Sequence, residues 1–130
     1  MGRRRWIAAA VGLAVLSADL IDSATTPTVY FHARPIWILA CGAAAAVTLL
    51  VLAPRVPSLA LSLGAGSATG GAVGTLAAAL VWSQGVPDPL VRGSVAFNVA
   101  DVGIAVGSAL VISSALLVGR RRRHALRQPI

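Results

Sequence analysis

Four long runs of apolar residues follow one another along this chain of 130 residues. Polar segments that contain prolines separate the runs, and proline ends helices because it lacks an amide donor and disfavours helix at the residue before it. The runs cover about residues 6–21, 36–53, 59–82 and 99–118, each near the roughly 20 residues that a helix needs to cross a bilayer. The pattern therefore predicts an all-α membrane protein, a single domain over residues 1–130 in which four transmembrane helices form a bundle.

The charged residues leave the apolar runs almost untouched and gather at the chain ends. They make up 12% of the residues, against about 25% in soluble domains, so the chain lacks the polar surface of a water-soluble fold. The eleven basic residues are all arginine, and eight of them form two clusters: Arg3–Arg5, and Arg120–Arg123 with Arg127 in a basic tail over residues 119–130. Arginine-rich flanks of membrane helices stay in the cytoplasm, and four crossings return the chain to its starting side, so both termini are predicted to be cytoplasmic.

The net charge of +7 calls for an anionic partner. Arginine clusters pair well with the phosphates of nucleic acids, and equally with anionic lipid headgroups beside a membrane helix. Apolar runs directly adjoin both clusters, so membrane lipids are the expected partner and nucleic acid is not.

Glycines recur at helical spacing in the last two runs. Gly66, Gly70 and Gly74 are four residues apart in the third run, as are Gly103 and Gly107 in the fourth. Small residues on one stripe of a membrane helix let two backbones approach closely. These stripes are therefore predicted to be faces for helix–helix association.

All four acidic residues fall at one end of the predicted helices. Asp19 and Asp22 end the first run and share a helical face, Asp88 follows the third run, and Asp101 begins the fourth with Asn98 three residues before it. Ionisable groups inside a membrane are costly and are functional candidates by default. The alternative for Asp101 is an interfacial position, where the dipole of a helix N-terminus favours a carboxylate.

The sequence contains no pattern of metal ligands. Cys41 is the only cysteine, and His32 and His124 each lie alone in polar segments, so no metal, no cofactor and no role for either histidine is predicted.

Two short motifs carry a family resemblance. Residues 97–104 read FNVADVGI and residues 70–75 read GGAVGT. The first resembles the FNxADxxI signature of lipoprotein signal peptidase, the signal peptidase II family, and the second resembles the GGAxGN stretch of that family. Asp88 resembles the aspartate of a VxD segment that follows, and Asp19 fits the aspartate of a DQxxK motif on the first helix. Over most of its length the chain is similar to a shortened, divergent member of this family.

The resemblance implies an aspartic endopeptidase of the plasma membrane. Such enzymes remove the signal peptide from diacylglyceryl-modified prolipoproteins, so a prolipoprotein or its signal peptide helix is the implied partner. The chemistry uses two aspartates at the outer leaflet: one deprotonates water, while the other holds a proton and polarises the scissile carbonyl. Asp101 takes the second of these positions. The supporting residues that the resemblance implies are Asn98, Asp19, Asp88, Gly70, Gly71 and Gly74.

The first catalytic position departs from the family. The motif continues as GGAxGNxxDR, and this chain has Thr75 at the asparagine, Ala78 at the catalytic aspartate and Ala79 at the arginine. Asp88 and Asp22 are the two remaining candidates for the carboxylate that pairs with Asp101. Two functions stay open: a peptidase that uses such a substitute, and a non-catalytic membrane scaffold or modulator that binds helices or lipoprotein precursors.

Overall fold

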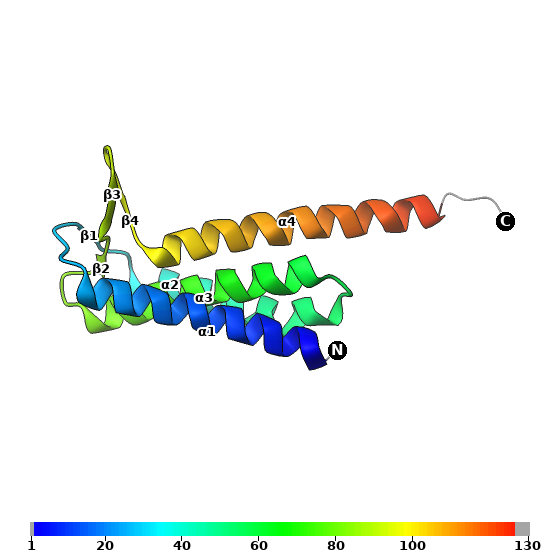
Figure 1. The fold of residues 1–130 in the computed structure, drawn as a ribbon, viewed down its shortest axis with the longest axis horizontal. Coiled ribbons are helices and arrows are strands. Elements are labelled where there is room, and N and C mark those ends of the chain that lie inside the picture. Colours follow the sequence, from blue (N-terminus) through cyan, green and yellow to red (C-terminus); the bar gives the residue numbers. More distant parts are fainter. Residues whose placement is uncertain (1, 127–130) are drawn as a thin grey trace.

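The structure, a computed structural model, describes residues 2–126 and is built around four helices (Figure 1). These are α1 (Gly2–Thr25), α2 (Ile36–Leu52), α3 (Leu59–Val81) and α4 (Val99–Leu126). By length and composition all four can cross a membrane, α2 together with the short 3-10 helix η1 (Ala53–Arg55). The prediction of an all-α protein is therefore confirmed, as is the prediction of four helices long and apolar enough to span a membrane. The end of the expected basic tail, residues 127–130, lies outside the described residues.

Two helices are longer than the apolar runs that predicted them. α1 begins before the arginines 3–5 and continues past Asp22, and α4 continues through the arginines 120–123. Arginine is a good helix former, so a helix continues where the apolar run stops. The apolar runs therefore underestimate the lengths of these two helices.

Helix α3 lies at the centre of the bundle. It packs against α1, α2 and α4, and it is the most buried of the four, whereas α2 and α4 make almost no direct contact within residues 2–126. Figure 1 shows that the start of α1, the end of α4 and the α2–α3 turn lie at one end of the bundle. We call this the arginine end, because it carries Arg3–Arg5, Arg55 and Arg120–Arg123. The opposite end, which carries Asp19, Asp22, Asp88 and Asp101, is the aspartate end.

Glycines on two faces of α3 let its neighbours approach. On the α1 face, a Cβ atom at Gly70 would collide with the carbonyl oxygen of Gly12. On the α4 face, a Cβ atom at Gly64 would lie 2.8 Å from the carbonyl oxygen of Gly107. The predicted stripes therefore pack between helices within the bundle, and Gly71, which is not part of either stripe, faces α4.

Hydroxyl groups add interhelical hydrogen bonds to this close packing. Thr69 donates from Oγ1 to the carbonyl oxygen of Ala46 on α2 over 2.7 Å, and Ser67 donates to that of Gly103 on α4 over 2.9 Å. Such bonds stabilise helix pairs where apolar burial gives little driving force between them. The Oγ of Ser58 begins α3 by accepting from the amide of Leu61.

Short strands, which the sequence did not predict, order the loops at the aspartate end. β1 (Phe31–His32) pairs antiparallel with β2 (Val86–Pro87) and so joins the first loop to the third. β3 (Leu90–Arg92) and β4 (Val95–Phe97) form a hairpin that projects sideways from the bundle (Figure 1).

Candidate active site at the aspartate end

The four aspartates lie together, as the sequence predicted. Asp19 is fully buried and Asp88 is 5% exposed. The carboxylates of Asp22, Asp88 and Asp101 are all near enough to Asp19 to act on it electrostatically. Buried carboxylates are costly unless they are hydrogen-bonded, so their partners decide what this end of the molecule can do.

Three side chains cap the first turn of α4. Oδ1 of Asn98 accepts from the amide of Asp101 (2.9 Å), and Oδ2 of Asp101 accepts from the amide of Asn98 (3.2 Å). This reciprocal pair is a capping box. Oδ1 of Asp19 reaches across from α1 and accepts from the amide of Ala100 over 2.8 Å. The spacing of Asn98 and Asp101 thus has a structural reason, and α1 is tied to the start of α4.

Asn98 also links Asp101 to Asp88. Its Nδ2 donates to Oδ1 of Asp88 and to the carbonyl oxygen of Pro87, each over 3.2 Å, and its side chain is almost completely buried. An amide nitrogen carries two hydrogens, so both acceptors are satisfied at once. The two aspartates therefore stand on either side of one asparagine and bond to it directly.

His32 completes the row. Its Nδ1 lies 2.6 Å from Oδ2 of Asp88, a hydrogen bond and, when the ring is protonated, an ion pair. The β1–β2 ladder and a bond from the Asp88 amide to the carbonyl oxygen of Tyr30 (2.9 Å) hold the two loops in this register. Gly85 allows the turn before β2 with a φ of +108°, which favours glycine. His32, for which no role was predicted, therefore belongs to this group of hydrogen-bonded residues.

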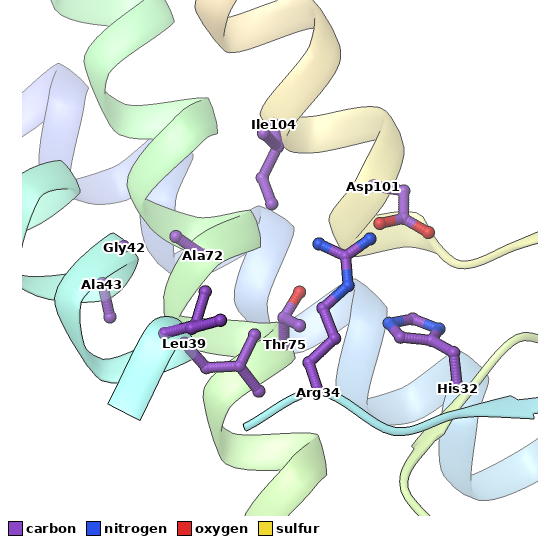
Figure 2. Close-up of a pocket in the computed structure, with 10 residues that line it drawn as sticks. His32, Arg34, Leu39, Gly42, Ala43, Ala72, Thr75, Asp101 and Ile104 are labelled. Carbon is purple, nitrogen blue, oxygen red and sulfur yellow. The ribbon is translucent and has the colours of Figure 1, made fainter. Parts of the chain in front are cut away.

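A pocket of about 180 Å³ opens beside this row, between α2, α3 and α4 (Figure 2). Figure 2 shows the guanidinium of Arg34 directed to the space between Thr75 and Asp101, with the ring of His32 beside it. The opposite wall is apolar. The polar side is lined by His32, Arg34, Thr75 and Asp101, and the apolar side by Ile38, Leu39, Ala43, Ala72 and Ile104.

Ala78 lies elsewhere. It is fully buried and follows Gly74 by one helical turn, on the α1 face of α3. Gly74 faces Asp19, because a Cβ atom there would lie 2.9 Å from Asp19 Oδ2. A carboxylate at position 78 would therefore enter the packing between α1 and α3. The geometry favours Asp88 as the carboxylate that accompanies Asp101.

Asp22 has different surroundings. Its Oδ1 accepts from the hydroxyl of Thr26 over 2.7 Å, and of the four aspartates only Asp101 is among the residues that line the pocket. Three buried oxygens on this part of α1 have no hydrogen-bond partner among the described residues, namely Asp19 Oδ2, Asp22 Oδ2 and Ser23 Oγ. Of the two substitutes that the sequence left open, the structure connects only Asp88 to Asp101 within residues 2–126.

Within the described part of the chain, no group of three His, Cys, Asp or Glu side chains is placed to hold a metal ion. Searches against models of known protein families and against curated proteins find no match to this chain.

Proposed function

We propose that this chain is a signal peptidase II-like aspartic endopeptidase of the plasma membrane, in which Asp88 and Asp101 form the catalytic pair. The observation that carries the proposal is the direct bonding of both residues to Asn98, beside a pocket with one polar and one apolar side. A peptide segment presents a polar backbone together with apolar side chains, and the pocket matches that combination. The substrate would be the signal peptide of a diacylglyceryl-modified prolipoprotein.

Hydrogen bonding divides the roles of the two carboxylates. Both oxygens of Asp88 accept hydrogen bonds, Oδ1 from Asn98 and Oδ2 from His32. Asp101 uses Oδ2 in the capping box, and its Oδ1 accepts no hydrogen bond from the residues that the structure describes. An ionised carboxylate only accepts, whereas a protonated one also donates. In the proposed reaction Asp88 is the base, and Asp101, protonated for that step, faces the substrate with Oδ1.

The reaction follows from this division. Asp88 takes a proton from water as the water oxygen bonds to the scissile carbonyl carbon, and Asp101 donates a hydrogen bond to the carbonyl oxygen. The C–N bond then breaks, and the leaving amine takes the proton that Asp88 received. His32 and Asn98 position Asp88 throughout and do not exchange protons with the substrate.

The proposed orientation places both termini in the cytoplasm and the aspartate end at the outer face. It is supported by the arginines at the opposite end, because such residues flank membrane helices on the cytoplasmic side. The substrate would reach the pocket after its precursor has entered the membrane.

A second function, binding of precursors without cleavage, is favoured by the absence of a carboxylate at Ala78 and by the capping role of Asp101. Cleavage of a diacylglyceryl-modified precursor by the purified protein, followed on a gel, separates the two functions. The peptidase cuts, and Asp101→Asn, which keeps an acceptor for the cap, cuts at least about 100-fold more slowly. Precursor binding without any cleavage by the unaltered protein would establish the non-catalytic function instead.

A further inference from the structure

A second pocket lies at the arginine end, far from the site described above. It has a volume of about 280 Å³ and lies where α4 passes the start of α3 and the turn after η1. Its walls are apolar except for one arginine, Arg122. The lining residues are Val56, Leu61, Ala115, Val118, Gly119 and Arg122. Figure 1 shows α4 continuing beyond the other three helices at this end, so this pocket lies at their edge.

A second guanidinium lies next to the same pocket. Arg4, in the first turn of α1, donates from Nη1 to the carbonyl oxygen of Val56 over 2.8 Å. Val56 is itself a wall residue, and Arg55 precedes it. Arg122 of α4 therefore lines the apolar cavity, and Arg4 of α1 adds a second positive charge at one of its wall residues.

Nothing anionic from the described chain balances this charge. All four acidic residues of the sequence lie at the aspartate end, and the ion pair found within residues 2–126 joins His32 and Asp88 there. Guanidinium groups carry five N–H donors in a fork that suits phosphate. The arginine end thus offers donors and charge for a phosphate, next to a surface that suits a hydrocarbon chain.

We propose that this pocket binds one anionic phospholipid, with its phosphate on Arg122 and Arg4 and an acyl chain along the apolar walls. Basic pockets between membrane helices are suited to such headgroups, because the phosphate meets the arginines at the level where the chains enter the bilayer. Free phosphate would use only the arginines, and nucleic acid would use the charges but not the cavity. The combination of both features selects a lipid.

The test uses the full chain in a neutral detergent and counts bound molecules by native mass spectrometry. Dioleoylphosphatidylglycerol is added in one arm, dioleoylphosphatidylcholine in a second, and inorganic phosphate or a DNA duplex competes in two more. We expect one phosphatidylglycerol molecule to bind more tightly than phosphatidylcholine. Arg122→Gln weakens it about fivefold, the effect of removing one arginine near an anionic headgroup.

Matched variants separate the pocket from general charge. Arg122→Lys keeps the charge and retains most of the affinity, and Arg92→Gln, at the aspartate end, leaves it unchanged. Equal binding of the two lipids, or no effect of Arg122→Gln, would overturn the proposal. Complete displacement by phosphate would assign the site to a free anion, and displacement by the duplex would assign it to nucleic acid. The measurement involves no cleavage, so its outcome is independent of the proposed peptidase activity.

Discussion

The charged side chains at the two ends of this bundle have opposite surroundings. At the aspartate end, Asp19 and Asp88 are buried, and hydrogen bonds connect them to the backbone, to Asn98 and to His32. At the arginine end, the arginines of positions 3–5 and 120–123 lie mainly at the surface, and Arg4 makes a hydrogen bond to a carbonyl oxygen.

This difference in burial determines what the charged side chains contribute at each end. A buried carboxylate needs specific partners, because an unpartnered one is strongly destabilising, so each residue around it has a fixed task. An exposed arginine contributes little to stability on its own, and its effect on lipids and orientation is shared with its neighbours. Single substitutions should therefore have large effects at the aspartate end and small effects at the arginine end.

The largest effect is expected from a new charge inside the aspartate end. Ala78→Asp places a carboxylate at a fully buried position one turn from Gly74, which itself faces Asp19. We expect a loss of about 3–5 kcal/mol in the free energy of unfolding, because the new charge has no partner there. Thermal unfolding in detergent measures it, with Ala24→Asp at an exposed position of α1 as the control. A variant that is as stable as the unaltered chain and cuts faster would mean that position 78 faces the catalytic site.

Removal of the central amide should come next. Asn98→Ala takes away the acceptor for the amide of Asp101 and the donor to Asp88 and Pro87. The expected loss in the free energy of unfolding is about 2–4 kcal/mol, the sum of a lost helix cap and of buried acceptors left without donors. Asn98→Ser, which keeps a cap acceptor but is too short to donate to Asp88, should lose an intermediate amount. No loss in Asn98→Ser would show that the bond to Asp88 contributes nothing, whereas equal losses in both variants would show that the cap contributes nothing.

A smaller effect is expected at His32, whose side chain is 27% exposed. His32→Ala removes the donor to Asp88 and should lower kcat for precursor cleavage about tenfold, the rate equivalent of a hydrogen bond of about 1.4 kcal/mol. Arg34→Gln, at a residue that lines the same pocket, is the control and should change precursor binding more than kcat. An unchanged kcat in His32→Ala would exclude a positioning role.

The smallest effect is expected at the arginine end. Arg121→Gln should change the free energy of unfolding by less than about 0.5 kcal/mol, because the side chain is exposed. Thermal unfolding beside the Asn98 variants measures both ends under the same conditions. A loss comparable to that of Asn98→Ala would contradict the contrast between the two ends.

Much of the fold follows from local sequence patterns. The apolar runs predicted the four helices, the glycine spacing predicted their packing faces, and the positions of the aspartates predicted their common end. Each of these patterns is local, because it depends on length or spacing within one helix. The structure corrects the helix ends and divides the α3 glycines between two neighbours.

The hydrogen bonds that connect the residues of the site could not be predicted from such local patterns. His32 and Asp88 are 56 residues apart, and they meet only because β1 and β2 pair. No periodic pattern marks a strand of two residues. The motif resemblance placed the first carboxylate at position 78, where this chain has alanine. The hydrogen bonds of Asn98 instead connect Asp101 to Asp88. The position of Asp88 next to Asn98 and His32 thus depends on the fold of two loops.

The most direct test of the account is the rate at which Asp88→Asn cleaves a diacylglyceryl-modified precursor, compared with the unaltered chain. The substitution keeps the size of the side chain, and Asp22→Asn at the same end is the matched control. The account predicts a fall of at least about 100-fold for Asp88→Asn and an unchanged rate for the control. Cleavage by Asp88→Asn at the rate of the unaltered chain would contradict the pairing of Asp88 with Asp101.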